Sequence, residues 1–170
     1  MSNTNPSQLE VGQIIPPFTL PGPDGMPHSP WDYKQREHLL LLLTRKSTTS
    51  ETRGLLRAFT SQYANFREED CSILAISPDT VIVNLATQQE LHLPFALLAD
   101  PKREVISRYI AYPEEGRQTR TNPDSSLVSI VLADRYSALY QQWTAEKEAD
   151  LPPIEELLES LRYLNKLCTP

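Results

Sequence analysis

The feature that most constrains the fold of this chain is an unbroken apolar run, followed directly by a helix-start signal. Residues 38–44 read His-Leu-Leu-Leu-Leu-Leu-Thr, without a polar residue between the two ends. A strand with one face in water would alternate apolar and polar residues, so this run predicts a strand that is covered on both faces. Residues 48–51, Thr-Thr-Ser-Glu, form a capping-box pattern, in which Thr48 and Glu51 would satisfy backbone N–H groups at a helix start. The chain is therefore expected to contain a buried strand, a short polar turn and a helix in direct succession.

Further strands and helices alternate along the rest of the chain. Apolar runs predict strands at residues 71–77, 95–98, 127–133 and 138–143. Helical spacing and start signals predict helices at residues 48–66, 78–91, 100–109 and 154–167. A Pro- and Gly-rich region before the first long strand, with Pro23-Asp24-Gly25 as its turn, predicts a short edge hairpin. This order predicts an α/β fold with a central mixed sheet and flanking helices.

Length, charge and hydropathy indicate a single globular domain and argue against nucleic-acid-binding and membrane-spanning proteins. The chain has 170 residues, which fits one domain at residues 9–167 with a flexible N-terminal tail at 1–8 and a C-terminal tail at 168–170. The formal net charge is −6 and the basic residues are scattered, which argues against nucleic-acid binding. No apolar run reaches the roughly 18 residues of a membrane span. The polar N-terminus lacks a secretory pattern, so we expect a soluble, cytoplasmic protein that does not bind membranes.

Four segments in a fixed order carry a resemblance to a known family. They lie at residues 11–18 (VGQIIPPF), 73–79 (ILAISPD), 93–101 (LPFALLADP) and 131–136 (VLADRY). Together they resemble the redoxin side of the thioredoxin superfamily, which holds alkyl hydroperoxide reductases and other peroxiredoxins. The resemblance covers most of residues 9–165. It implies a thioredoxin-like fold with a peroxiredoxin-like N-terminal hairpin, and it implies thiol-based redox chemistry.

The turn where this family carries its reactive thiol contains no cysteine in this chain. Family members place the thiol at the start of the helix after the first long strand, because N–H groups and the helix dipole lower its pKa there. The two family thiol positions map to Thr49 and Thr52, and residues 47–53 contain no cysteine at all. The family's cis-proline position maps to Val128, so this feature is lost as well. A threonine hydroxyl without a neighbouring base is a poor nucleophile, so we expect no catalytic residue at this turn.

Two cysteines elsewhere in the chain provide an alternative redox site. Cys71 begins a predicted strand, so about seven residues at 3.3 Å each place it roughly 20 Å from the carboxyl edge of the sheet, where reactive groups collect in such folds. Cys168 follows the last predicted helix. We interpret Cys71 as a buried apolar residue and Cys168 as part of the tail. A thiol-dependent peroxidase or oxidoreductase that uses either cysteine stays open as the alternative.

The same turn is a candidate anion site. Free N–H groups and the positive end of the helix dipole meet at a helix start. The residues that would contribute are Arg45, Lys46, Ser47, Thr48 and Thr49. Ordinary helix capping on a solvated loop explains the same residues.

The three histidines, His28, His38 and His92, lack the spacing of metal ligands, so we expect neither a metal nor a cofactor. The sequence thus favours a non-catalytic binding or interaction module with a degenerate redox site. Its partner would be a small anion or another protein. A symmetric homodimer is also expected, through an edge strand near residues 138–143 or through the helix termini beside the turn.

Overall fold

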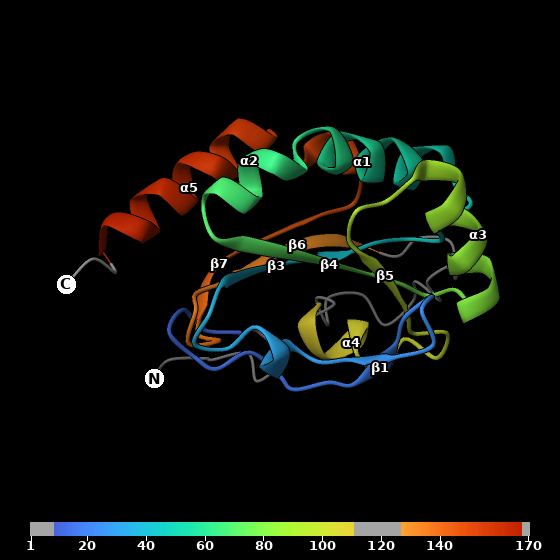
Figure 1. The fold of residues 1–170 in the computed structure, drawn as a ribbon, viewed down its shortest axis with the longest axis horizontal. Helices are drawn as coiled ribbons and strands as arrows, with labels where there is room; N and C mark the ends of the chain where they lie inside the picture. The colour runs from blue at the N-terminus through green and yellow to red at the C-terminus, as the bar shows by residue number, and fades with distance from the viewer. Residues whose placement is uncertain (1–8, 111–126, 168–170) are drawn as a thin grey trace, which may run out of the picture.

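A five-stranded mixed sheet forms the centre of the computed structural model, which describes residues 9–110 and 127–167 (Figure 1). The strands are β3 (His38–Leu43), β4 (Cys71–Ser77), β5 (Ala96–Ala99), β6 (Val128–Ala133) and β7 (Leu139–Ala145). Their order in the sheet is β5-β4-β3-β6-β7. The β3–β4 and β4–β5 pairs are parallel, whereas β3–β6 and β6–β7 are antiparallel. The carboxyl ends of β3, β4 and β5 therefore share one edge of the sheet with the start of β6.

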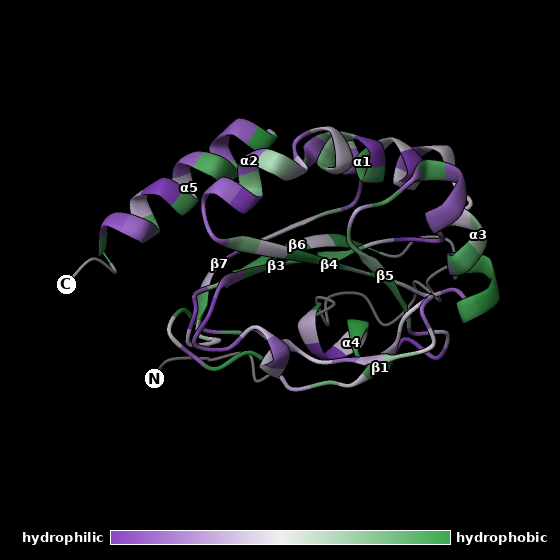
Figure 2. Ribbon diagram, viewed as in Figure 1, coloured by the Kyte–Doolittle hydropathy of each residue, from purple (hydrophilic) through white to green (hydrophobic). Residues whose placement is uncertain are grey.

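Both faces of β3 are covered, as its unbroken apolar run predicts. All six of its residues are buried. Leu40 and Leu42 belong to a core cluster with side chains of the helices above the sheet, whereas Leu41 and Leu43 belong to a second cluster on the other face. Figure 2 shows the apolar colouring of the central strands and the mixed colouring of the helices that cover them. Because successive side chains of a strand point to opposite faces, each leucine of the run has a core to fill.

Helices cover the sheet and connect its strands. They are α1 (Ser50–Ser61), α2 (Tyr63–Glu68), α3 (Val81–Leu91), α4 (Ile106–Tyr109) and α5 (Ile154–Leu167). Figure 1 shows α1, α2 and α5 on one face of the sheet, with α4 and the N-terminal segment on the other. Two predicted helices differ from the structure. The helix expected at residues 48–66 is broken at Gln62, whose φ of −105° and ψ of 5° are not helical.

The other difference concerns the helix expected at residues 100–109, which begins only at Ile106. The reason is the buried carboxylate of Asp100, whose Oδ2 accepts hydrogen bonds from the N–H groups of Val105 at 3.0 Å and Ile106 at 2.9 Å. This side chain satisfies backbone donors that a longer helix would have bonded internally. The segment from Asp100 to Val105 is therefore a turn. It leads into the short helix α4, which packs in the core cluster that contains Leu41 and Leu43.

The predicted N-terminal hairpin is confirmed. It consists of β1 (Leu20–Pro21) and β2 (Pro27–His28), which pair in antiparallel fashion. Gly25 in its turn has a φ of +76°, a conformation that glycine adopts without a steric cost. Phe18, just before β1, packs edge-on against Tyr109 of α4 with ring centroids 6.1 Å apart. The hairpin thereby closes the second core, and a short 3₁₀ helix, η1 (Pro30–Asp32), follows it before β3.

The strand β7 forms one outer edge of the sheet. The N-terminal segment covers its beginning, because Ile14 bridges Ala138 and the N–H of Gly12 donates to the Leu139 carbonyl at 2.7 Å. Along the rest of β7, no other described residue pairs with the outer edge of its backbone. The predicted homodimer through this strand stays a prediction. Within the described part of the chain, no helix combines the length and the apolar character that crossing a membrane requires.

A buried histidine lies at the opposite end of the sheet from the turn after β3. The His38 side chain is fully buried, and its Nε2 lies 2.8 Å from Oδ1 of Asn165 in α5. Its Nδ1 is buried without a partner among the described residues. A second ring proton would therefore be a buried donor without an acceptor, and burial lowers the pKa of His38. Asp70, Asp134 and Arg135 are the charged groups nearby.

We predict that His38 makes the protein less stable in acid. An unfolded chain takes up a proton on this imidazole below a pH of about 6.5, whereas the folded chain resists it. The free energy of unfolding should therefore be intact above this pH and fall as the pH drops toward the folded pKa, at up to about 1.4 kcal/mol per pH unit. Urea unfolding between neutral and mildly acidic pH measures this slope.

In the His38→Gln variant, the free energy of unfolding should no longer fall in this way with pH. At neutral pH it should be lower than in the unmodified protein. His92→Asn is the matched control, because His92 is exposed and has a left-handed backbone that asparagine accepts. An unchanged pH slope in His38→Gln would contradict the assignment.

Candidate functional site

The turn that the sequence singles out lies at the carboxyl edge of the three parallel strands. It joins the end of β3 to the start of α1. Leu43, the last residue of β3, pairs with Ser129 of β6, so Val128 begins β6 at the same edge. The structure thus brings Val128 and the threonine turn to one end of the sheet. Val128 is buried, and the described residues contain no cis peptide bond.

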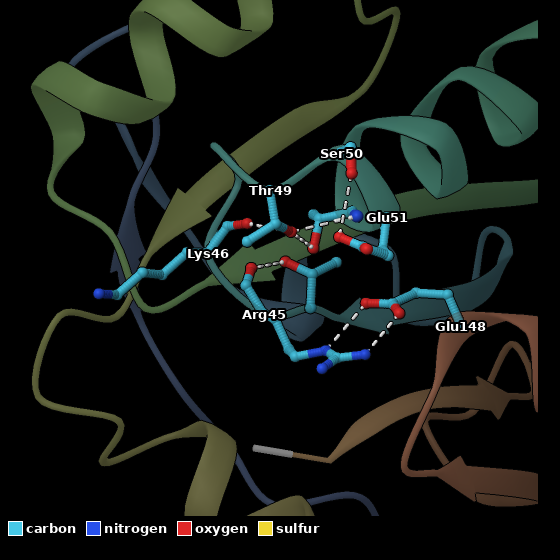
Figure 3. A network of polar contacts seen from close by, with 8 residues as sticks. Arg45, Lys46, Thr49, Ser50, Glu51 and Glu148 are labelled. Atoms are coloured by element: carbon cyan, nitrogen blue, oxygen red, sulfur yellow. Dashed lines mark hydrogen bonds and ion pairs between the residues drawn. The ribbon is translucent and has the colours of Figure 1, made fainter. Parts of the chain in front are cut away.

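Thr49 caps the helix that follows the turn. Its Oγ1 accepts a hydrogen bond from the Thr52 N–H at 3.3 Å and donates to the Lys46 carbonyl at 3.0 Å. The buried hydroxyl of Thr52 lies 2.9 Å from the same oxygen (Figure 3). Thr49 and Thr52, to which the resemblance assigns the family's thiol positions, therefore carry hydroxyls that bond to each other and to the backbone. This arrangement stabilises a helix start and leaves neither oxygen activated.

The capping box predicted for Thr48 and Glu51 is wrong by one residue. The N-cap is Thr49, whereas Thr48 is exposed. Glu51 accepts a hydrogen bond from the Ser50 hydroxyl at 3.2 Å instead of reaching back to the backbone of the cap. Each of three successive hydroxyl residues can act as a cap, so local pattern does not choose among them. The choice follows from the burial of Thr52, which fixes the rotation of α1 against the sheet.

Ser47 is buried and already has partners. Its N–H donates to Oδ2 of Asp79 at 2.6 Å, and its Oγ lies 3.1 Å from Oγ1 of Thr87 in α3. Asn84, also in α3, accepts a 2.7 Å hydrogen bond from Ser77 at the end of β4. Its amide nitrogen is buried and has no partner among the described residues. A buried network of hydroxyl and amide groups thus joins the turn to β4 and α3.

Arg45 is paired with a carboxylate that is distant in sequence. Its guanidinium donates to Glu148 through Nε at 3.0 Å and through Nη2 at 2.6 Å, in the bidentate geometry that arginine favours. The carboxylate belongs to η2 (Glu148–Asp150), a 3₁₀ helix between β7 and α5. This hydrogen bond raises the pKa of Arg45. The exposed side chain of Lys46 points away from the pair, as Figure 3 shows.

Two carboxylates of the chain itself therefore occupy donors that an external anion would need. Asp79 accepts from the Ser47 N–H and Glu148 accepts from Arg45. Sequence reasoning missed both residues. Asp79 directly follows the strand next to β3, and the shared carboxyl edge of parallel strands could have indicated it. Glu148 lies 103 residues from Arg45 and carries no local signal.

Cys71 lies at the far end of the sheet, as predicted. It pairs in register with His38, the first residue of β3, whereas the turn follows Leu43 at the other end. Its side chain is fully buried, and burial raises the pKa of its thiol well above the usual range. Such a thiol is present almost entirely in its unreactive protonated form. Cys168 lies outside the described residues.

The turn presents capped hydroxyls and paired charges. Among the described residues, no histidine or thiol belongs to it, and the carboxylate that accepts from one of its hydroxyls is exposed Glu51, which accepts from Ser50. No group of three His, Cys, Asp or Glu side chains within residues 9–110 and 127–167 is arranged to hold a metal ion. Among the described residues, the turn therefore presents hydrogen-bonding groups and no thiol.

The fold and the position of the turn define a thioredoxin-like protein of the peroxiredoxin type. Residues 11–130 match the model of the AhpC/TSA family, and the chain belongs to this family. Peroxiredoxin bcp1 of Schizosaccharomyces pombe is 29% identical over 102 residues, which span 60% of this chain and only 52% of that protein. Peroxiredoxin Bcp of Bacillus subtilis is 24% identical over 93% of this chain and 98% of its own length.

Solved structures confirm the fold. The crystal structure of peroxidoxin BcpB from Mycobacterium tuberculosis superposes with a TM-score of 0.76, at 16% identity, and covers 92% of this chain and 98% of that chain. Peroxiredoxin Q of Xanthomonas campestris superposes with a TM-score of 0.73, at 18% identity, over 91% of this chain and 96% of that one. The expected thioredoxin-like fold with a central mixed sheet is thereby confirmed.

We predict that Thr49, and not Thr48, stabilises the start of α1. Thr49→Ala removes the acceptor for the Thr52 N–H and should lower the free energy of unfolding by about 1 kcal/mol. Thr48→Ala is the matched control, and its effect should stay within about 0.5 kcal/mol because the side chain is exposed. Chemical denaturation of the two variants measures the difference. Equal losses in both would contradict the observed cap.

We also predict that Cys71 does not react with thiol reagents in the folded protein. In a Cys168→Ser variant, Cys71 is the sole thiol, and its labelling by a disulfide reagent should be at least about 100-fold slower than that of a free thiol. The same variant in denaturant should react at once with one equivalent of reagent. Rapid labelling under native conditions would show that the thiol is accessible.

Proposed function

We propose that this protein is a non-catalytic member of the AhpC/TSA family that acts as a binding or interaction module. One observation carries the proposal: hydroxyls occupy the family's thiol positions, while the thiol of Cys71 is buried at the opposite end of the sheet. Thiol chemistry needs an accessible thiolate next to groups that stabilise it. In the described part of the chain, the groups that would stabilise a thiolate and the thiol itself lie at opposite edges.

A protein partner fits this site better than a small anion. An anion at the turn would compete with Asp79 for the Ser47 N–H and with Glu148 for Arg45. Both carboxylates are covalently part of the chain and hence present at high effective concentration. Lys46 and the exposed hydroxyl of Thr48 are what such an anion could still contact, so its affinity should be low.

The alternative is a thiol-dependent peroxidase that uses Cys71 or Cys168. The names of the relatives favour it, since they are peroxiredoxins. The burial of Cys71 speaks against it, because a peroxide would have to reach a side chain with no exposed surface. Fold alone does not decide between the two, since one fold carries many activities.

We predict that the protein does not reduce hydrogen peroxide or an organic hydroperoxide with dithiothreitol or a thioredoxin system as the electron donor. Its rate should equal that of the Cys71→Ser, Cys168→Ser double variant, which retains the turn and lacks every thiol of the chain. Peroxide consumption under excess reductant measures this. A rate well above that of the double variant would refute the proposed function, and the two single variants would then identify the cysteine responsible.

A further inference from the structure

A groove runs along the exposed side of α1, next to the threonine turn. It lies between α1 and the segment that joins β7 to α5, and its volume is about 450 Å³. Figure 1 shows α5 beginning beside α1 above the sheet. The apolar part of its lining consists of Leu55, Ala58, Phe59, Leu151, Pro153 and Ile154.

The apolar surface of the groove belongs to the main core. Phe59 is buried, whereas Leu55, Leu151 and Ile154 are only partly buried and pack against the core cluster above the sheet. Pro152 and Pro153 form part of the opposite wall, and the fixed φ of proline stiffens that wall. A stiff wall loses little conformational entropy when a ligand binds. The groove is thus a preformed hydrophobic surface rather than a collapsed one.

The charged side chains that line the groove are acidic. The charged residues that line it are Glu148 and Glu155, which pair with Arg45 and Arg162 respectively. The segment that supplies this wall, residues 146–156, carries three further carboxylates outside the lining, and none of them forms an ion pair with another described residue: Glu146, Asp150 and Glu156. Lys147 is the one basic residue within residues 146–156. The wall therefore carries a net negative charge.

Glu148 connects the groove to the turn. Its carboxylate lines the groove and also holds Arg45, at 2.6 Å, at the end of β3. The helix α1 takes part in both features, because it begins at Thr49 and lines the groove with its second and third turns. The groove and the turn therefore lie near each other and are joined through Glu148 and α1.

From these observations we propose that the groove docks a protein segment in which one or two large apolar side chains are flanked by lysine or arginine. The apolar side chains lie on Phe59 and Leu55, and the basic residues face the carboxylates of the wall. The volume of about 450 Å³ falls in the range of roughly 300–1,000 Å³ that is typical of binding pockets. This inference rests on the proposed function and specifies the partner chemistry of the binding module.

The test uses a fluorescein-labelled peptide in which two leucines are flanked by lysines, and a matched peptide with glutamates in place of the lysines. Fluorescence anisotropy with the full-length protein should give a Kd on the order of 10–100 μM for the lysine peptide at low salt. The glutamate peptide should bind at least about tenfold more weakly. Added salt should weaken the binding of the lysine peptide, because Glu155 and the carboxylates of Glu146, Asp150 and Glu156 are exposed.

Matched variants locate the binding. Ala58→Arg fills the groove from an exposed helical position and should weaken binding at least about tenfold. Ala64→Arg makes the same change at an exposed position of α2. Ala64 lies outside the groove lining, so this variant should leave binding unchanged. Glu155→Gln should weaken binding about two- to threefold, whereas Glu159→Gln, on the same helix but outside the groove lining, should not. Circular dichroism confirms that each variant is folded.

Three results would overturn the proposal. The lysine peptide does not bind, the two peptides bind equally well, or Ala58→Arg and Ala64→Arg change the binding equally. Self-association of the protein that Ala58→Arg abolishes would overturn it too, in favour of a second copy in the groove. Failure here is distinguishable from failure of the proposed function. If the peptide does not bind and the protein does not reduce peroxide, only the docking proposal is refuted. If the protein reduces peroxide through a thiol, the non-catalytic role is refuted.

Discussion

The parallel pairing of β3 and β4, with both strands buried on both faces, is the constraint on which the rest of the structure depends. Because the two strands run in the same direction, His38 and Cys71 lie at one end, and the residues after Leu43 and Ser77 lie at the other. Every polar group that follows a parallel strand is thereby collected at a single edge. The helices and the N-terminal hairpin then cover the two faces, each against its own core cluster.

The edge of the sheet at the turn is held together by hydrogen bonds and by the ion pair between Arg45 and Glu148. Thr49 and Thr52 bond to each other, and Ser47 bonds to Asp79 and Thr87. Buried polar groups of this kind need partners, since each unsatisfied group costs free energy. The hydroxyls at the two positions where the sequence analysis expects the family's thiols therefore have partners. The fold of the family is thus present around a turn that carries hydroxyls, and fold alone does not determine an activity.

The ion pair between Arg45 and Glu148 has a second consequence for the surface. It ties the segment before α5 to the end of β3, across 103 residues of sequence. Glu148 is largely buried in this pair, and a bidentate arginine–carboxylate contact has a defined geometry. The ion pair thus connects one residue of the groove lining to the turn before α1. A surface that recognises another protein benefits from such rigidity, because less ordering is required on binding.

Much of this structure was predictable from the sequence, because burial leaves a periodic pattern in the chain. The unbroken leucines of β3 and the apolar stripe of α5 indicated their elements, and the absence of cysteine from residues 47–53 was visible directly. The position of Cys71 at the amino end of β4 followed from strand order alone. Local patterns suffice for such features, since each depends on neighbouring residues and on which face is covered.

The tertiary structure decided which polar side chains meet. It chose Thr49 over Thr48 as the cap, because the burial of Thr52 fixes the rotation of α1. It also brought together Arg45 and Glu148, which are 103 positions apart, and His38 and Asn165, which are 127 positions apart. These pairs depend on how whole elements pack against each other, and a polar side chain carries no periodic sign of its distant partner. The sequence by itself determined the strands, the helices and the missing thiols, whereas packing alone assigned the partners of the candidate site.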